Sequence, residues 1–286
     1  MRKTAIQSSQ KQIANSLKAS TQIIKHNLTS KELRILKKVQ TQKASSRKAY
    51  TKNGKYTLAR QRIHNKIMNK YLRQDNRTRS PDIYIFGGIA GSGKTTTLKR
   101  YVKERAMTIN SDDIKNDLAK YNPSPIKKYP LMHARFLHEE STDIEKKLII
   151  KAIKGRKDII LDKTLANLSK IRRLIRSVRG RGYEVTILGT NLPPHVALLR
   201  VASRFLKHGR YVPLKRVALT GNRTNRNVLR IAKNRMVVNA RVMYDRNGRQ
   251  KVLYLKRKGF NKARKKKRRR QHGIIEGMAK VKSFNL

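Results

Sequence analysis

The segment from residue 83 to residue 95 constrains the fold more than any other part of the chain. An apolar run, Ile83-Tyr84-Ile85-Phe86, leads into Gly88-Ile89-Ala90-Gly91-Ser92-Gly93-Lys94-Thr95. The second stretch matches G-x-x-x-x-G-K-[ST], the phosphate-binding loop (P-loop) that joins a strand to a helix. Its glycines let the backbone wrap around phosphates, and the amide groups at the start of the helix point at them. We therefore expect this turn to bind a nucleoside triphosphate.

The polar groups of this loop have expected roles. Lys94 supplies positive charge to the phosphoryl group being transferred, and the Thr95 hydroxyl holds Mg²⁺. The nucleotide, expected to be ATP, is bound by residues of the loop and the first helical turn: Gly88, Gly91, Ser92, Gly93, Lys94, Thr95 and Thr96. The motif alone does not distinguish a kinase from an ATPase or a GTPase.

Around and after the loop, short apolar runs alternate with amphipathic stretches. Strands are predicted at 83–86, 107–110, 158–162 and 183–188, and helices at 94–106, 131–153, 167–178 and 193–207. Near the end, the segments 235–244 and 250–255 flank Asn247-Gly248, which predicts a β-hairpin. Strands that alternate with helices form a parallel sheet covered on both faces. We therefore predict an α/β fold, a P-loop NTPase with a doubly wound parallel sheet.

The charge of the chain is far from balanced. Of its 286 residues, 72 are Lys or Arg and 16 are Asp or Glu, which gives a net charge of +56. Such a chain repels itself unless a polyanion screens it. This argues for nucleic acid or an anionic membrane surface as a partner, and against a free small-metabolite enzyme. No stretch approaches the ~20 apolar residues that cross a bilayer, so we expect no membrane span.

Charge and pattern divide the chain into three predicted parts: a basic arm (1–80), a kinase-like domain (81–255) and a basic tail (256–286). They carry net charges of +19, +25 and +12. A second helix of the arm is predicted from Leu58 to Leu72. The first part of the arm has one thin apolar stripe at helical spacing, formed by Ile6, Ile13, Leu17, Ile24, Leu28 and Ile35. We expect a solvated arm, helical or disordered, that orders only on a partner.

The tail contains an unbroken block of seven basic residues from Arg264 to Arg270. Such a block cannot pack in a core and is suited to contact phosphate backbones. Aromatic residues are sparse there, so we expect sequence-tolerant binding of nucleic acid, either DNA or RNA. A disordered tail or a localisation signal is the alternative, and the basic, Ser-rich start of the chain also suits an organelle transit peptide. The expected location is intracellular (cytoplasmic) or inside a nucleoprotein particle such as a virion.

Carboxylates at two strand ends are candidates for handling the transferred phosphate. Asp162 ends the strand 158–162, where an ATPase places the Asp that organises Mg²⁺. Asp112 and Asp113 follow the strand 107–110, where a kinase places a carboxylate beside the acceptor hydroxyl. Carboxyl ends of strands meet at the ligand crevice of a doubly wound sheet, so these groups face the P-loop. Asp112 and Asp113 are equally suited to capping the helix that follows them.

Metal and thiol chemistry is not indicated by the remaining residues. The chain has no Cys, and its seven His do not occur at metal-ligand spacing. His133 and His138 are five residues apart, and His138-Glu139 lacks the second His of H-E-x-x-H. We interpret the histidines as structural or surface residues.

Six short pieces, in order along residues 81–255, resemble the zeta-toxin group of P-loop kinases, which share their core with polynucleotide kinases. The first is the P-loop itself. The others are Ile109-Asn110-Ser111-Asp112, His138-Glu139-Glu140-Ser141, Asp162-Lys163-Thr164-Leu165, Gly209-Arg210-Tyr211-Val212-Pro213 and Tyr244-Asp245-Arg246-Asn247-Gly248. The segments 1–80 and 256–286 have no counterpart in this resemblance.

The resemblance implies a role for each matching position. Asp112 is the base beside the acceptor hydroxyl, and Arg210, with Arg200 or Arg204, neutralises the charge of the transferring phosphoryl group. The acceptor pocket is lined by Glu139 or Glu140, Asp162 and Thr164. The family usually has Gly where this chain has Lys163. A cation there suits an anionic acceptor, such as a nucleic-acid 5′-hydroxyl end, better than a nucleotide sugar.

The sequence thus predicts an ATP-dependent phosphotransferase of the zeta-toxin/polynucleotide-kinase kind with nucleic-acid-binding extensions. The alternative is a structural, nucleic-acid-binding component of a nucleoprotein particle, a virion interior or a ribosome, built on a kinase-like domain. A third, weaker interpretation is a P-loop ATPase that uses Asp162.

Overall fold

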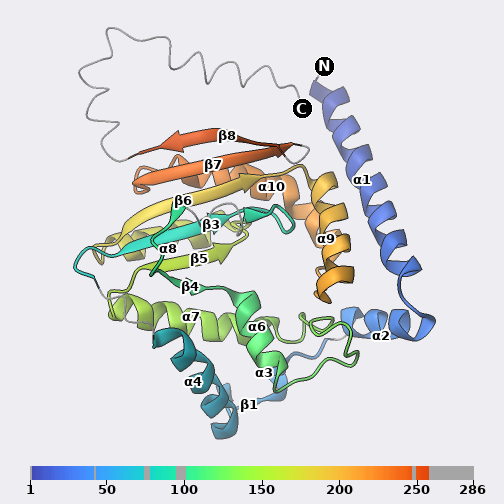
Figure 1. Ribbon diagram of the computed structural model, residues 1–286, viewed down its shortest axis with the longest axis horizontal. Coiled ribbons are helices and arrows are strands. Elements are labelled where there is room, and N and C mark those ends of the chain that lie inside the picture. The colour runs from blue at the N-terminus through green and yellow to red at the C-terminus, as the bar shows by residue number, and fades with distance from the viewer. Residues whose placement is uncertain (1, 42, 74–77, 95–100, 247–248, 258–286) are drawn as a thin grey trace.

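A six-stranded sheet forms the centre of the computed structural model, which describes residues 2–41, 43–73, 78–94, 101–246 and 249–257. The strands run in the order β4-β5-β3-β6-β7-β8; the first five are parallel and β8 is antiparallel to β7 (Figure 1). Their bounds are β3 (Asp82–Gly87), β4 (Met107–Ile109), β5 (Ile159–Lys163), β6 (Glu184–Asn191), β7 (Asn239–Arg246) and β8 (Arg249–Lys256). The predicted α/β class with a parallel sheet is confirmed.

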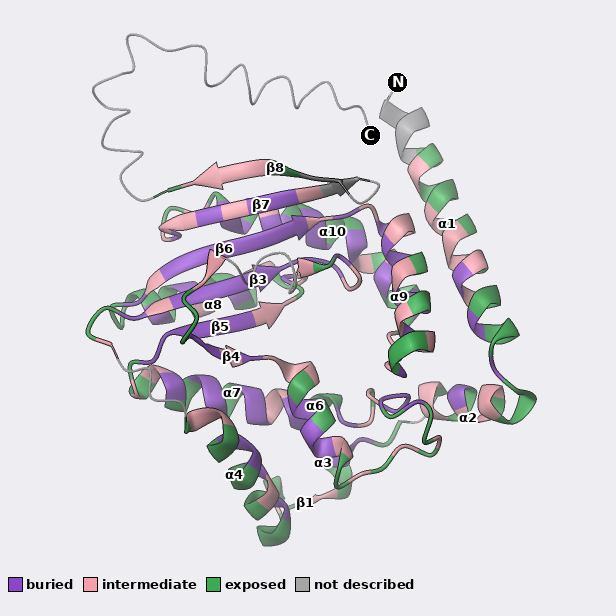
Figure 2. Cartoon of the chain, in the orientation of Figure 1, coloured by how far each residue is buried: buried purple, intermediate pink, exposed green. Residues whose placement is uncertain are grey.

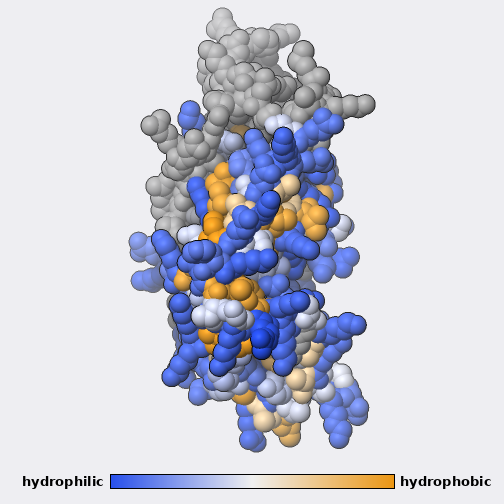
Figure 3. Space-filling model, turned by 90° about the vertical axis from the view of Figure 1, so that its right-hand side faces the viewer, coloured by the Kyte–Doolittle hydropathy of each residue, from blue (hydrophilic) through white to orange (hydrophobic). Residues whose placement is uncertain are grey.

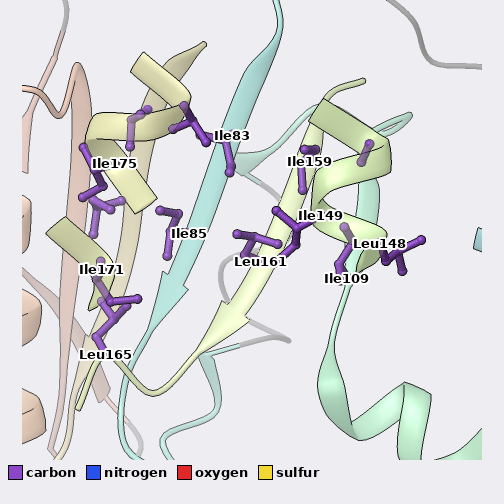
Figure 4. Close-up of a cluster of buried hydrophobic side chains, with 14 of the residues drawn as sticks. Ile83, Ile85, Ile109, Leu148, Ile149, Ile159, Leu161, Leu165, Ile171 and Ile175 are labelled. Carbon is purple, nitrogen blue, oxygen red and sulfur yellow. The ribbon is translucent and has the colours of Figure 1, made fainter. Parts of the chain in front are cut away.

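The strand that leads into the P-loop, β3, lies in the middle of the sheet between β5 and β6. Ile83 and Ile85 point to one face and pack with side chains of β5 and of the helices over that face (Figure 4). Tyr84 and Phe86 point to the other face, where they pack with Ile160 and its neighbours. A strand covered on both faces must be apolar at every position, which explains the unbroken run in the sequence.

Helices that follow β4, β5 and β6 in the chain cover the sheet and flank its edge. α8 (Leu168–Arg179) and α10 (Leu214–Ala232) both contact β6 on one face, and α9 (Pro194–His208) packs on α10 (Figure 1). α6 (Ser111–Ala119) and α7 (His138–Lys154) pack together near β4. The sequence analysis missed α10, although its apolar residues Leu214, Val217, Val228 and Ile231 recur at helical spacing.

Two predicted helices are wrong at one end. The helix expected from residue 131 begins at His138, because the backbone amide of Leu131 pairs with the carbonyl of Gly209 and the chain then forms turns. Of the helix expected at 94–106, residues 95–100 lie outside the described residues and 101–106 form no α-helix. The β7–β8 hairpin is present, while the predicted Asn247-Gly248 turn lies outside the described residues.

The predicted solvated arm is corrected by the structure. α1 (Arg2–His26) runs beside α9 and also contacts α10 (Figure 1). Ile24 and Leu28 are buried in one cluster with Leu198, Val201 and Phe205 of α9. From Ile13 to Ile35, the apolar stripe of the arm therefore packs against the domain of the same chain. Seen from this side, hydrophilic side chains cover most of the surface and hydrophobic ones show between them (Figure 3).

The chain turns between α1 and the next helix, so the residues of the apolar stripe are divided between two helices. α2 (Ser30–Thr41) begins after Thr29, whose hydroxyl accepts a hydrogen bond from the Glu32 amide, while the Glu32 carboxylate accepts one from the Thr29 amide. This reciprocal pair is a capping box, which fixes a helix start.

The rest of the arm lies against α7. It comprises α3 (Ser46–Ala49), the short strands β1 (Thr51–Lys52) and β2 (Lys55–Tyr56), and α4 (Leu58–Leu72). The bounds of α4 are those predicted. Its inner face is buried and its outer face is exposed (Figure 2). Among the described helices, none has the length and apolarity needed to span a bilayer.

Candidate nucleotide and acceptor site

The P-loop leaves β3 at the middle of the sheet and is packed tightly against its neighbours. A Cβ atom at Gly88 would lie 2.4 Å from the Thr190 hydroxyl oxygen at the end of β6. Gly91 has φ +83°, and a Cβ atom there would lie 3.0 Å from the Ala197 carbonyl oxygen of α9. Only glycine fits these two positions, because a side chain would clash and the backbone is left-handed at Gly91. The sequence pattern is therefore required by the packing of the loop.

Two further predicted loop residues differ in their surroundings. The Ser92 side chain is fully buried, and its hydroxyl accepts a 2.6 Å hydrogen bond from Thr190. This contact holds the loop to β6. Gly93 has φ +67° and open space where a side chain would be, so its backbone is accessible. The predicted ligands Thr95 and Thr96 lie outside the described residues.

Lys94 and Asp162 form an ion pair across the crevice, with 3.3 Å between Nζ and Oδ1. Asp162 is paired in register with Phe86, so it lies at the carboxyl end of β5 next to the loop strand. Both side chains are largely buried. The predicted convergence of the carboxyl ends of the strands therefore brings these two residues together.

Asp112 lies at the start of α6, where the Asn110 side chain caps the helix by accepting a 2.9 Å hydrogen bond from the Asp112 amide. Its carboxylate accepts hydrogen bonds from Lys115 Nζ, at 3.0 Å, and from the Arg210 guanidinium. Burial raises the pKa of Asp112, but Lys115 and Arg210 outweigh that effect and hold the pKa below its ordinary value. Asp112 is therefore ionised at neutral pH and ready to accept a hydrogen bond from a hydroxyl.

Asp113 faces a different environment. The Asp113 side chain is exposed. The pKa of Tyr71 in α4 is raised by the burial of that tyrosine and then by the charges of Asp117 and Asp113. The structure thus separates the two neighbouring acids that the sequence placed at the same strand end.

Arg210 is placed by an unusual contact of the segment before it. Gly209 ends α9 with φ +66°, and a Cβ atom there would lie 2.4 Å from Pro130. The next residues form a single parallel bridge between Leu131 and Arg210. This close crossing directs the Arg210 side chain to Asp112.

Arg200 and Arg204 come from α9, which also packs on the P-loop. Burial and the nearby Arg210 lower the pKa of Arg204, while Asp112 and Asp162 oppose that shift. Within the described part of the chain, no hydrogen-bond acceptor reaches the buried Nε atom of Arg204. Arg200 lies at the other end of this face, with its Cβ atom 3.4 Å from where a Cβ of Gly91 would be.

A shallow groove of about 390 Å³ runs along this face of α9. It is lined by Leu199, Arg200, Ser203, Arg204, Lys207 and His208. The glycine cradle of the loop, the unsatisfied Arg204 Nε atom and the cations of this groove fit a polyphosphate. Asp162 is the described carboxylate closest to Lys94 and is suited to a divalent cation bound with that polyphosphate.

The structure places the residues predicted to line the acceptor pocket in two different environments, exposed and buried. Glu139 is exposed and accepts a 2.6 Å hydrogen bond from the Ser45 hydroxyl. Thr164 is exposed just after β5. Glu140, in contrast, is fully buried and bound by Arg60 and His64 of α4, so it does not line an open pocket in this structure.

Lys163 also differs from expectation. Its ammonium group donates a hydrogen bond to the carboxylate of Glu145, a buried residue of α7. The charge of Lys163 is therefore largely neutralised, and it does not supply the free cation beside the acceptor pocket that the sequence suggested.

Two residues that the sequence analysis did not assign to the site belong to this cluster. Lys115 binds Asp112 from one helical turn later, a spacing at which side chains meet on a helix. His138 is close enough that Asp112 affects its pKa, although burial first, and then Lys115 and Arg216, lower that pKa. The i,i+3 spacing of Asp112 and Lys115 was a usable signal, and His138 was part of a piece that resembles the family but was interpreted as a structural or surface residue.

Comparison with known proteins assigns the chain to a family. A sequence profile of the Zeta toxin family matches residues 68–258, more than half of the chain. A calmodulin calcium-dependent NAD kinase of Arabidopsis thaliana is 29% identical over 132 residues, which are 39% of this chain and 25% of that protein. The chain therefore spans about a quarter of the length of this relative.

Solved structures share the fold at low identity. The AvrRxo1-ORF1:-ORF2 complex with ATP has a TM-score of 0.54 at 17% identity, covering 74% of this chain and 76% of the other. The PezAT toxin–antitoxin system of Streptococcus pneumoniae has a TM-score of 0.53 at 13% identity, covering 79% and 95%. The sheet order, the P-loop and the family match agree, and this chain therefore belongs to the zeta-toxin family.

Proposed function

We propose that the chain transfers the γ-phosphoryl group of ATP to a hydroxyl of a phosphate-bearing nucleotide, with Asp112 as the base. The observation that carries this proposal is the Asp112 carboxylate, ionised and held by Lys115 and Arg210 at the same crevice as Lys94. It is a proton acceptor placed beside a phosphate-binding loop, which is the arrangement that phosphoryl transfer requires.

The proposed reaction has few steps. The acceptor hydroxyl donates a hydrogen bond to Asp112 and attacks the γ-phosphorus; the new O–P bond forms as the bond to the β-phosphate oxygen breaks, and the proton passes to Asp112. Lys94 and Arg204 neutralise the phosphate charge, and Arg210 turns from Asp112 to the phosphoryl group when the nucleotide binds. A Mg²⁺ ion held by Thr95 and Asp162 supplies further charge neutralisation when bound.

Charge supports an anionic acceptor. Four cationic side chains, Lys94, Lys115, Arg204 and Arg210, surround two carboxylates, Asp112 and Asp162. The excess of positive charge suits a substrate that brings phosphates of its own. The relative that is an NAD kinase favours a dinucleotide, and the basic extensions favour a nucleic-acid hydroxyl end.

A panel of acceptors tests this proposal. Purified full-length protein is incubated with ATP and Mg²⁺ and with NAD, a nucleotide sugar or a 5′-hydroxyl oligonucleotide, and the products are identified by mass spectrometry. We expect phosphate on NAD or on the oligonucleotide, and none with the Lys94→Ala variant, because that variant lacks the cation of the P-loop. Equal turnover in that variant would contradict the P-loop assignment.

We also propose that the basic extensions bind nucleic acid without sequence preference. The support is the +12 net charge of residues 256–286 and the row of exposed lysines on α1, Lys11, Lys18 and Lys25. Binding through phosphates weakens steeply with salt, by about 0.9 in log K per log salt for each phosphate neutralised. Deletion of residues 258–286 should therefore give a shallower salt dependence than the full chain on a duplex and on an RNA of equal length.

A structural role in a nucleoprotein particle is the second candidate, because a chain with a net charge of +56 repels itself unless a polyanion screens it. The two candidates differ in one result. A purely structural protein would bind nucleic acid as described but would transfer phosphate to none of the acceptors.

A further inference from the structure

The outer face of α8 and α10 is densely cationic. Neither helix contains an Asp or Glu residue. Their exposed basic side chains are Lys170, Arg172, Arg173, Arg176 and Arg179 on α8, and Lys215, Arg216, Arg223, Arg226 and Arg230 on α10. We call this set the α8–α10 surface.

The cations of α10 are arranged in a row. Arg216, Arg223, Arg226 and Arg230 fall within about 80° of one another at 100° per residue. From the first to the last, the row extends about 21 Å along the helix axis at 1.5 Å per residue. That length corresponds to about six steps of a nucleic-acid strand at 3.4 Å per phosphate. A row of this spacing can contact several successive phosphates of one strand.

The second row comes from α8. α8 and α10 lie side by side on the same face of the sheet, and they contact each other (Figure 1). Packed helices have axes about 8–10 Å apart, so the two rows run near each other. Two near-parallel rows of guanidinium groups suit a phosphate backbone, because Arg binds phosphate oxygens with two parallel hydrogen bonds.

We propose that the α8–α10 surface is a docking site for the phosphate backbone of nucleic acid, separate from the basic extensions and from the phosphoryl-transfer site. A membrane surface fits less well. An amphipathic helix binds lipid by inserting an apolar face. The apolar faces of these helices, with Ile171, Ile175 and Val228, are buried against the sheet and are unavailable.

The direction of α10 links this surface to the catalytic edge. α10 starts near Arg210, and the charge of Arg216 is close enough to lower the pKa of His138 after the larger effect of burial and that of Lys115. It ends toward the start of β7, whose first residue, Asn239, pairs with Thr186 near the beginning of β6. A strand bound along α10 therefore leads toward the crevice with Asp112.

The test compares three full-length proteins: wild type, the variant R172Q/R176Q/R226Q/R230Q, and a control R62Q/K66Q/K151Q/K154Q. The control removes four exposed cations from α4 and α7, which are not part of the α8–α10 surface. Gln keeps helix propensity while removing charge. None of the eight side chains belongs to the proposed catalytic site. Affinity for a random-sequence duplex, and for an RNA of equal length, is measured by fluorescence anisotropy across a range of salt concentrations.

We expect the slope of log K against log salt to become shallower by up to about 3.6 in the α8–α10 variant, from four lost phosphate contacts at about 0.9 each. The control should retain most of the wild-type slope. Equal slopes in all three proteins, or equal changes in both variants, would overturn the proposal. Loss of binding to phosphatidylserine vesicles without any change in nucleic-acid slope would also overturn it, in favour of a membrane surface.

Phosphate transfer from ATP to NAD, the small dinucleotide acceptor of the panel above, is measured in the same proteins. Because the α8–α10 surface is distinct from Asp112 and Lys94, turnover should be unchanged in both variants. A shallower salt slope with full turnover would support the surface whether or not the proposed acceptor is correct, so failure of one proposal does not conceal failure of the other.

Discussion

Asp112 and Glu140 are both carboxylates held by two basic side chains, yet they lie in very different places. The Asp112 side chain is 24% exposed at the crevice, with Lys115 and Arg210 as partners. The Glu140 side chain is 0% exposed between α4 and α7, where Arg60 contacts both of its oxygens at 2.5 and 2.8 Å and His64 contacts one at 2.6 Å. The first carboxylate is accessible to a substrate and the second is not.

The comparison shows that a shifted pKa does not by itself mark a catalytic group. Both carboxylates have a lowered pKa. In Glu140 burial raises the pKa, but hydrogen bonds from His64, Arg60 and Ser46 outweigh it and lower the pKa to about 2. What separates them is access and the neighbouring P-loop: Asp112 faces Lys94, whereas Glu140 fastens α4 to α7.

Replacing Asp112 by Asn should give the largest effect of any change in this comparison. Asn has nearly the same shape but cannot accept the proton, so we expect turnover to fall by about 10²–10⁴-fold with ATP binding retained. Stability should change by less than about 1 kcal/mol, because the group is partly exposed. Initial rates, nucleotide affinity and thermal unfolding measure the three quantities. Asp113→Asn is the matched control, and a greater loss there or in Asp162→Asn would show that the base has been misassigned.

Glu140→Gln should act on stability. Removing one partner of a buried ion pair leaves Arg60 uncompensated, which costs about 3–5 kcal/mol. Urea unfolding monitored by circular dichroism measures this loss. Glu139→Gln is the control, since it alters a neighbouring but exposed carboxylate. If the two variants were equally stable, the anchoring role of Glu140 would be refuted.

The pH dependence of stability sharpens the same contrast. The ordinary pKa of 4.5 applies to Glu140 in the unfolded chain, against about 2 in the folded one. A carboxylate with a depressed folded pKa stabilises the fold above its unfolded pKa, and this contribution disappears as the pH falls toward the folded value. The difference in unfolding free energy between wild type and Glu140→Gln should therefore be constant above about pH 5.5 and shrink by about 3 kcal/mol toward pH 2. A difference that stays constant down to that pH would contradict the assignment.

The smallest expected effect comes from Ser45, which links the arm to α7 next to Glu140. Its hydroxyl donates a hydrogen bond to Glu139 and accepts one from the Lys48 amide as the cap of α3. Ser45→Ala should destabilise the protein by about 1 kcal/mol, the usual cost of losing a helix cap. Thermal unfolding measures the change, with Ser45→Asn as the variant expected to restore the cap. Turnover per folded molecule should not change.

Local patterns were enough to predict the catalytic edge. The P-loop, the apolar runs at β3, β5 and β6, and the acids at the ends of β4 and β5 follow rules that relate neighbouring residues, and parallel strands bring those ends to one side. The sheet order confirms the α/β class, and the family match places the chain in the zeta-toxin family. The roles assigned to Asp112, Lys94, Arg204 and Arg210 stay predictions with a consistent geometry.

The sequence by itself determined what each segment can do, whereas only the tertiary structure decided which distant segments meet. Helical spacing predicted an apolar stripe in the arm, but its burial against α9 depends on residues about 170 positions later in the chain. Glu140 was placed correctly on a helix, but its partner Arg60 is 80 residues away. Periodicity reports the face of one element; the contact between two faces depends on packing and charge in three dimensions, and no local pattern encodes it.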